Sequence, residues 1–272
     1  MRTRDVLLGV DELPRHEAVR LLMLATGRTR PDVLLGFDVT PVEREAFASF
    51  VERRRSNEPL QYIEGIVAFG PVELQVELRV DDRVLIPRPE TEYLFEQVVE
   101  IVDNPGVIID LCTGSGNLAL ALKAAFPTAE VYAVELSPDA AEVARENAIY
   151  NNLDVDVLVG DLFGPLPGEL MGTVDLVVSN PPYLARHELV DLPRDVLAEP
   201  EMALIAGETG DEVLAKIADG AYQWLAPGGV VACEISEFQG LRAAVLFDRY
   251  DASIVEDLTG RVRYVIGSRG FE

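Results

Sequence analysis

The sequence predicts an α/β fold, with an open and mostly parallel sheet covered by helices on both faces, preceded by a small helical domain and a β-hairpin. Three observations predict it. Apolar positions recur at helical spacing in residues 1–60, apolar and polar side chains alternate in residues 61–86, and short apolar strands alternate with amphipathic helices over residues 87–272. We expect three parts with these boundaries: a helical domain, a hairpin linker and a main domain.

Helical spacing is clearest at Ala18, Leu21 and Leu22 and again at Phe47 and Val51. Turns are expected near Gly27, Pro31 and Pro41. The hairpin is expected around Gly70-Pro71, where apolar side chains alternate with polar ones from Ile66 to Leu78.

The main domain contains seven candidate strands. They are Val107–Leu111, Val131–Glu135, Val155–Val159, Val174–Ser179, Val230–Ile235, Ser253–Glu256 and Val262–Ile266. In open α/β sheets, ligands bind beyond the carboxyl ends of the strands, so the turns after the first four strands are expected to form the site.

The charge distribution disfavours a nucleic-acid substrate. Residues 1–60 carry ten arginines, no lysine and ten acidic residues, so the rest of the chain carries the whole formal charge of −24. A protein that neutralises phosphates needs clustered Lys and Arg side chains.

Neither a membrane span nor a signal peptide is predicted, because no run approaches 18 apolar residues and the first 30 positions are interrupted by charges. We therefore expect a cytoplasmic protein. Cys112 and Cys233 lie in apolar runs without metal-ligand spacing, which predicts two buried free thiols and no metal site.

A glycine loop follows the first strand of the main domain. Gly114 and Gly116 allow a tight turn and a close approach of the backbone to a ligand, and the next helix runs from Leu118 to Phe126. Glu135 ends the second strand, where a carboxylate can accept hydrogen bonds from both hydroxyls of a ribose. Together these residues predict a nucleoside-containing cofactor.

The glycine spacing also fits NAD or FAD, and Asp110 decides between the cofactors. An acid before the glycines disfavours a pyrophosphate, but it can face the ammonium and sulfonium charges of S-adenosylmethionine. After the third strand, Asp161 can accept the adenine amino group and Leu162 can cover the ring. We therefore expect S-adenosylmethionine.

The fourth strand leads into Asn180, Pro181, Pro182 and Tyr183. Two prolines fix the backbone and remove two N–H donors, which leaves rigidly placed carbonyl acceptors. With the side-chain carbonyl of Asn180, they can hold both hydrogens of one NH2 group, while Tyr183 covers its flat face. The motif predicts methyl transfer to a planar NH2 group, with alignment lowering the barrier by up to ~7–11 kcal/mol.

These motifs and several others resemble the HemK or PrmC group of protein-(glutamine-N5) methyltransferases, which act on class-one peptide release factors. The resemblance covers nearly the whole chain. Its further motifs are Glu58–Gly65 with Phe69-Gly70, Leu85–Glu92, Glu199-Pro200, Ala203-Leu204, Ala206-Gly207, Leu225–Gly229, Glu234-Ile235, Gln239 and Asp257–Arg261.

This resemblance implies a class I S-adenosylmethionine-dependent methyltransferase with a Rossmann-like, seven-stranded sheet. It implies that residues 1–60 dock the release factor and that Asn180 to Tyr183 hold the glutamine of a Gly-Gly-Gln loop. It also implies a set of cofactor contacts, namely Cys112, Thr113, Gly114, Ser115, Gly116, Glu135, Leu162 and Asn180. A monomer is expected.

Some features depart from the family pattern or leave a choice open. Cys112 and Ser236 stand where Gly is usual, and a positive φ at residue 112 would weaken the loop. Arg88, Glu90 and Glu92 fit either substrate binding or the opening of a helix. The alternative functions are methylation of glutamine in a ribosomal protein, methylation of adenine N6 in nucleic acid, and a catalytically idle binding protein.

Overall fold

The computed structural model describes residues 1–271; Glu272, the last residue of the predicted main domain, lies outside them. The chain forms two compact units, one of residues 1–65 with 193–198 and the other of residues 66–192 with 199 to the end. Within residues 1–271, no helix combines the length and the apolar character that crossing a membrane requires.

The first unit is helical. Its helices are α1 (Thr3–Leu8), α2 (Arg15–Thr26), α3 (Arg30–Leu35), α4 (Pro41–Arg55), α5 (Leu60–Glu64) and the short 3₁₀ turn η3 (Val196–Ala198). Gly27 ends α2 in the left-handed region, with φ of 64°. Pro31 and Pro41 lie in the first turns of α3 and α4 rather than in turns between helices, because a missing N–H costs nothing at a helix start.

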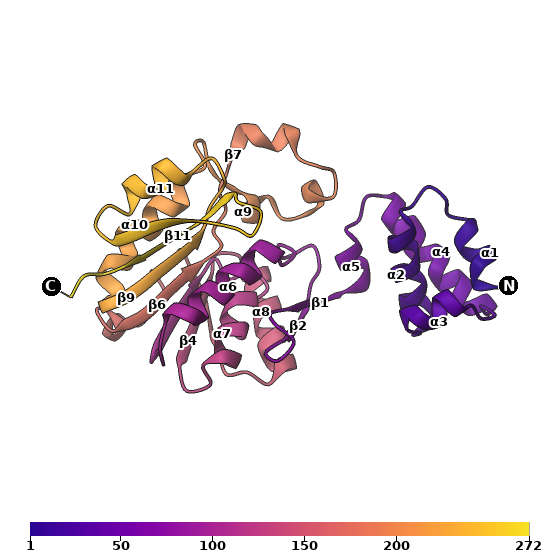
Figure 1. Cartoon of the computed structure of the whole chain (residues 1–272), viewed down its shortest axis with the longest axis horizontal. Helices are drawn as coiled ribbons and strands as arrows, with labels where there is room; N and C mark the ends of the chain where they lie inside the picture. Colours follow the sequence, from indigo (N-terminus) through magenta and orange to yellow (C-terminus); the bar gives the residue numbers. More distant parts are fainter. Residues whose placement is uncertain (272) are drawn as a thin grey trace. The chain divides into compact units, whose positions relative to one another are not determined.

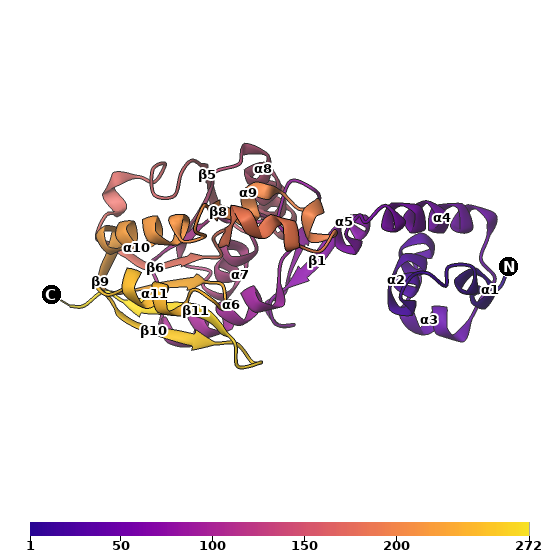
Figure 2. The ribbon, with the colours of Figure 1, turned by 90° about the horizontal axis from the view of Figure 1, so that it is seen from above.

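Capping boxes fix the starts of α3 and α4. The Thr40 hydroxyl accepts the N–H of Glu43 at 3.2 Å, and the Glu43 carboxylate accepts the N–H of Thr40 at 2.7 Å. Thr29 and Asp32 form the same arrangement. The apolar faces then bury a core that contains Leu21, which is fully enclosed. This unit is therefore a small helical bundle with a core of its own (Figures 1 and 2).

The second unit is built on a seven-stranded sheet with the order β10-β11-β9-β6-β3-β4-β5. The strands are β3 (Val107–Leu111), β4 (Glu130–Glu135), β5 (Asp156–Val159), β6 (Val174–Ser179), β9 (Leu225–Glu234), β10 (Asp251–Glu256) and β11 (Val262–Ser268). The five strands from β9 to β5 are parallel, and β11 pairs antiparallel with both of its neighbours. The predicted α/β fold with a mostly parallel sheet is confirmed.

Helices cover both faces of this sheet. They are α6 (Pro89–Ile101), α7 (Asn117–Ala125) and α8 (Pro138–Asn151) on one face, and α10 (Glu212–Trp224) and α11 (Gly240–Leu246) on the other (Figure 1). Because both faces are covered, the central strands β3 and β6 are mostly apolar, and Ile109 and Val177 are fully buried. The remaining elements are η1 (Gly168–Leu170), β7 (Leu184–Ala185), η2 (Arg186–Asp191), α9 (Glu201–Leu204) and β8 (Ile205–Gly207).

A hairpin of β1 (Ile66–Phe69) and β2 (Val76–Arg79) precedes the sheet. Asn147 of α8 is fully buried and its amide holds the backbone of Arg79 in both directions, accepting the N–H at 2.7 Å and donating to the carbonyl at 3.0 Å. The same amide donates to the carbonyl of Ser115 at 2.9 Å. One side chain thereby ties the hairpin to the glycine loop. Residues 61–64, at the start of the predicted linker, form most of α5.

Candidate active site

The glycine loop between β3 and α7 has a left-handed backbone at three positions. Cys112, Gly114 and Gly116 have φ of 59°, 55° and 86°. A side chain at Gly116 would meet Leu120 at 3.3 Å, so glycine there serves both the conformation and the packing of α7. Cys112 has the positive φ that we expected to weaken the loop, because a side chain in this region is strained.

Asp110 braces this loop from beneath. Its carboxylate oxygen Oδ2 accepts the Thr113 hydroxyl at 2.5 Å and the N–H of Ala119 at 3.1 Å. Burial raises the pKa of Asp110 to about 7. The residue is not among those that line the cavity described below, and within residues 1–271 its other oxygen, Oδ1, has no hydrogen-bond partner. The expectation that it faces the charges of a cofactor stays a prediction. Its two hydrogen bonds fix the turn and the first residues of α7.

Glu135, at the end of β4, holds the other side of the loop. One carboxylate oxygen accepts the N–H of Gly114 and the other accepts the N–H of Ser137, both at 2.9 Å. Each oxygen has a second lone pair, and the residue lines the cavity. The carboxylate is therefore oriented by the backbone and still able to accept hydrogen bonds from a ligand.

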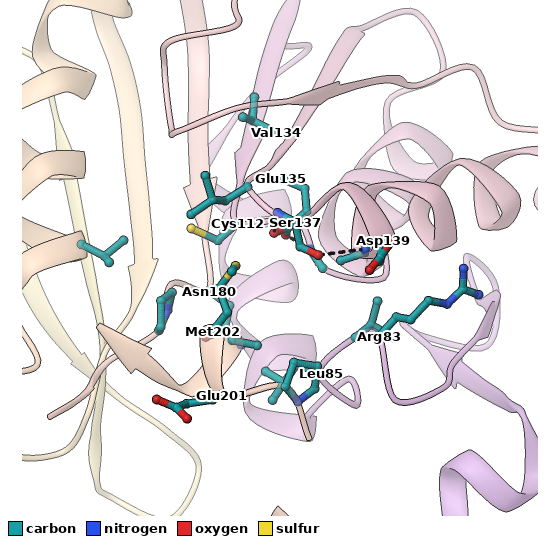
Figure 3. Close-up of a pocket in the computed structure, with 18 of the residues that line it drawn as sticks. Arg83, Leu85, Cys112, Val134, Glu135, Ser137, Asp139, Asn180, Glu201 and Met202 are labelled. Atoms are coloured by element: carbon teal, nitrogen blue, oxygen red, sulfur yellow. Dashed lines mark hydrogen bonds between the residues drawn. The ribbon is translucent and has the colours of Figure 1, made fainter. Parts of the chain in front are cut away.

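A cavity of about 410 Å³ opens at the carboxyl ends of β3, β4, β5 and β6. Figure 3 shows the side chains of Cys112, Glu135 and Asn180 around the same space. Of the predicted site residues, the structure brings together Cys112, Gly114, Glu135, Asp161, Leu162, Asn180 and Pro182 as lining. Thr113, Ser115, Gly116 and Pro181 do not line it and are buried. Tyr183, which is only partly buried, does not line it either.

Leu162 and Phe163, which follow β5, have different roles. Leu162 lines the cavity with φ of 48°, whereas Phe163 stacks on Trp224 with ring centroids 5.8 Å apart and belongs to the core. Asp161 also lines the cavity, and its carboxylate lies 3.2 Å from the Lys216 ammonium. Both side chains of this pair are mostly exposed, so it contributes little to stability and leaves Asp161 open to a ligand.

The segment after β6 presents Asn180 and Pro182 to the cavity, while Pro181 is buried. Burial raises the pKa of Tyr183 to about 12, so its hydroxyl stays protonated at neutral pH. Gly210 packs against this segment with φ of 87°, and a Cβ there would lie 2.7 Å from the Tyr183 carbonyl oxygen. Only glycine allows the two backbones to approach this closely.

The side chain of Asn180 is oriented by a buried chain of hydrogen bonds. Its amide nitrogen donates to the Thr91 hydroxyl at 2.9 Å, and that hydroxyl donates to a carboxylate oxygen of Glu234 at 2.7 Å. Thr91 lies in the first turn of α6 and Glu234 ends β9. Since the amide nitrogen faces Thr91, the amide oxygen is left for the cavity.

Arg88, Glu90 and Glu92 have partners within the fold. The Arg88 guanidinium pairs with the Glu199 carboxylate at 2.5 Å, and Glu92 accepts the N–H of Gly70 at 3.3 Å. The backbone carbonyl of Glu90 accepts the Tyr264 hydroxyl at 2.7 Å. Arg88 directly precedes α6, which Pro89 begins, and its side chain makes no cap hydrogen bond. These contacts tie the segment to distant parts of the fold, and both substrate binding and helix opening stay predictions.

Sequence reasoning did not assign a role to Thr91, Glu234 or Gly210. Thr91 and Glu234 belong to motifs that the chain shares with the family. The position of Glu234, an acid at the end of an apolar strand, could have indicated a functional residue. Cys112 lines the cavity and is only partly buried, unlike the fully buried Cys233. No group of three or more His, Cys, Asp or Glu side chains within residues 1–271 is arranged to hold a metal ion.

Two family models match the chain. The PrmC N-terminal domain matches residues 4–65, and the methyltransferase small domain matches residues 90–208. A release factor glutamine methyltransferase of Deinococcus radiodurans is 39% identical over 94% of this chain and 91% of its own. The enzyme of that name from Mycolicibacterium smegmatis is 40% identical over the same shares.

Solved structures show the same fold at lower identity. A methyltransferase from Pyrococcus furiosus superposes with a TM-score of 0.55 and 23% identity, covering 72% of this chain and 89% of its own. A T. thermophilus 16S rRNA N2 G1207 methyltransferase, solved with AdoMet and guanosine, superposes with a TM-score of 0.57 and 19% identity. It covers 75% of this chain and 50% of its own.

Proposed function

The chain belongs to the release factor glutamine methyltransferase family, and on that premise we propose that it methylates the glutamine of the Gly-Gly-Gln motif in class-one release factors. It is a protein-(glutamine-N5) methyltransferase that uses S-adenosylmethionine. The observation that carries the proposed chemistry is that Asn180 lines the cavity while its amide nitrogen is held by Thr91, which leaves its oxygen for a ligand. The relatives favour a release factor over a ribosomal protein or nucleic acid as substrate.

The residues around the cavity fit S-adenosylmethionine. A volume of about 410 Å³ lies in the range of small-ligand sites. Gly114 has open space where a Cβ would stand, so its backbone can lie directly against a ligand. Glu135 offers lone pairs suited to two ribose hydroxyls, and the cavity holds apolar Leu162 next to the acceptor Asp161, as an adenine ring requires.

We assign the remaining roles by position. The loop from Cys112 to Gly116 holds the methionine part, with Cys112 and Gly114 in contact and Thr113, Ser115 and Gly116 shaping the backbone. Asn180 lies close to both ligands, because it lines the cavity at the end of β6, where the Pro181 and Pro182 carbonyls are expected to receive the glutamine. Tyr183, which is partly buried next to Pro182, covers one face of the bound amide.

An amide nitrogen is a poor nucleophile because its lone pair is shared with the carbonyl. S-adenosylmethionine supplies a methyl group activated by a positively charged sulfur. The Asn180 oxygen and the proline carbonyls accept the two N–H hydrogens, which fixes the plane of the glutamine amide and turns its nitrogen toward the cavity. The N–CH3 bond forms as the S–CH3 bond breaks, and the extra proton on nitrogen then leaves to water.

We further propose that the helical unit of residues 1–65 docks the release factor, that the protein acts as a monomer and that it acts in the cytoplasm, where release factors meet the ribosome. The excess of acid over base outside residues 1–60 supports a protein substrate rather than a nucleic acid.

One experiment tests the proposed function. The protein is incubated with S-adenosylmethionine labelled in the methyl group and, separately, with a class-one release factor, its Gly-Gly-Gln to Gly-Gly-Ala variant, ribosomal proteins and adenine-containing RNA and DNA. We expect label on the unaltered release factor alone. Label on ribosomal protein or nucleic acid, with none on the release factor, would overturn the proposal.

A further inference from the structure

Thr91 and Glu234 form a buried chain of hydrogen bonds that ends on Asn180, the side chain on which the proposed mechanism depends. Thr91 is 0% exposed and Glu234 is 2% exposed, so water does not compete for their hydrogen bonds. Three elements meet there, since Asn180 follows β6, Thr91 lies at the start of α6 and Glu234 ends β9, next to β6 in the sheet.

The direction of these hydrogen bonds follows from the number of protons. A threonine hydroxyl has one hydrogen, and an ionised carboxylate can only accept. The Thr91 hydrogen is therefore committed to Glu234, at 2.7 Å. The Thr91 oxygen can then only accept, and it selects the NH2 end of the Asn180 amide, at 2.9 Å. The opposite end of that amide, the carbonyl oxygen, must face away from Thr91.

We propose that Thr91 and Glu234 are positioning residues that fix the orientation of the Asn180 amide and so keep an acceptor, rather than a donor, toward the NH2 group of the substrate. This inference rests on the proposed function. The substrate amide offers two hydrogens, so an Asn180 turned by 180° would set donor against donor and lose the interaction.

Protonation of Glu234 reverses the direction of the hydrogen bonds between Glu234, Thr91 and Asn180. A neutral Glu234 can donate to Thr91, whose own hydrogen is then free to bind the Asn180 oxygen, which stabilises the turned amide. The groups that face Glu234 come from three places in the fold. They are Thr91 and Glu90 of α6 with the preceding Arg88, Arg263 and Tyr264 of β11, and Tyr183 of the segment after β6. Burial raises the pKa of Glu234 to about 7, although the Thr91 hydrogen bond and the two arginines lower it. The ionised form is the productive one, so turnover falls as pH falls through this value.

The first test uses two substitutions of Thr91. Thr91→Val keeps the shape and removes the hydroxyl, whereas Thr91→Ser keeps the hydroxyl. We expect Thr91→Val to lower kcat on the release factor by about tenfold or more, the usual effect of losing a group that orients a ligand-binding residue. Thr91→Ser should stay within about threefold of the unaltered protein, and the Kd for S-adenosylmethionine should change by less than about twofold in both.

The second test is the pH profile of kcat between pH 5.5 and 8.5, roughly centred on the pKa of Glu234. The unaltered protein should lose activity on the acid side near pH 7, and Glu234→Gln, which cannot ionise, should lack this acid limb. Circular dichroism and S-adenosylmethionine binding verify folding, and the pH profile decides the matter if Thr91→Val does not fold.

Equal kcat for Thr91→Val and the unaltered protein would overturn the inference, as would an acid limb that persists in Glu234→Gln. Both comparisons require that the unaltered protein methylates the release factor. If the unaltered protein does not methylate the release factor, the proposed function fails. If it does but the variants behave as just described, only the roles of Thr91 and Glu234 fail.

Discussion

Asn180 has one end of its amide committed to Thr91 and the other facing the cavity. The side chain is thus preorganised before any substrate arrives, which is the condition under which a hydrogen-bond acceptor lowers a barrier. The same logic applies to Glu135, whose two oxygens are each held by a backbone N–H. At the scale of single residues, the site is a set of side chains whose orientation the fold has already fixed.

Asn180→Ala should therefore lower turnover far more than cofactor affinity. We expect kcat to fall by about 100-fold or more, because an interaction that aligns the reacting nitrogen is lost. Single-turnover methylation of the release factor measures the loss, and calorimetry measures the Kd for S-adenosylmethionine, which we expect to change by less than about threefold. Turnover close to that of the unaltered protein would show that the Asn180 acceptor is not needed.

Asp110 predicts a pH dependence of stability. Its pKa is about 7 in the folded protein and 3.8 in the reference state, so the folded protein binds the extra proton more tightly between these values. The unaltered protein should accordingly lose stability, relative to Asp110→Asn, as pH rises from about 4 to about 7. Urea unfolding of both proteins at pH 5 and pH 8 measures the difference, and a difference independent of pH would contradict the assignment.

At the scale of elements, the turns that form the active site at the carboxyl edge of the sheet are held in place by neighbouring segments. Asn147 links the hairpin of β1 and β2 to the glycine loop, and Gly210 lets the turn before α10 approach the carbonyl of Tyr183. Asn147 makes its contact through its side-chain amide, whereas Gly210 makes its contact through the backbone.

Gly210→Ala should disturb the segment from Asn180 to Tyr183, because the new Cβ would lie 2.7 Å from the Tyr183 oxygen. Gly260→Ala is the matched control. Gly260 has φ of 80°, close to the 87° of Gly210, but its nearest neighbour to a Cβ is 3.9 Å away. Both variants carry a conformational cost of about 1 kcal/mol, and only Gly210→Ala adds the clash.

We expect Gly210→Ala to lower both Tm and kcat, and Gly260→Ala to lower Tm slightly with kcat unchanged. Calorimetry and release factor methylation measure the two effects. Equal effects of the two substitutions on kcat would show that the approach of Gly210 to Tyr183 does not position the site.

At the scale of the whole molecule, the chain separates a nearly neutral helical unit from an acidic sheet unit, each with a hydrophobic core of its own. Residues 1–65 contain none of the cavity-lining residues. Binding of the cofactor and recognition of the release factor are therefore expected to depend on different parts of the chain.

A chain that begins at Ile66 should still bind S-adenosylmethionine, because the complete cavity lining lies in the sheet unit. We expect its kcat/KM on a whole release factor to fall by about tenfold or more through lost docking contacts. The shortened chain should methylate a short peptide containing Gly-Gly-Gln as efficiently as the full chain does. If kcat/KM fell equally for the peptide, the helical unit would support the site rather than dock the partner.

The sequence by itself determined the class of fold and seven of the 22 residues that line the cavity. Apolar periodicity predicted all seven strands of the sheet within two residues of their observed ends, except that β9 begins five residues earlier than predicted. The central strands were the clearest, because strands buried on both faces are mostly apolar. The glycine loop and Asn180 were found because each directly follows a strand, and Glu135 because it ends one. The carboxyl ends of parallel strands meet at one edge of the sheet.

Only the tertiary structure decided how these side chains are held. Asn180 and Thr91 are 89 residues apart, and Thr91 and Glu234 are 143 apart, so no local pattern relates them. The sequence placed Asp110 next to the glycine loop, but it did not predict that the carboxylate binds Thr113 and Ala119 and so stabilises the turn. Local periodicity decides which segments are buried, whereas hydrogen bonds between distant segments depend on how helices and strands pack together.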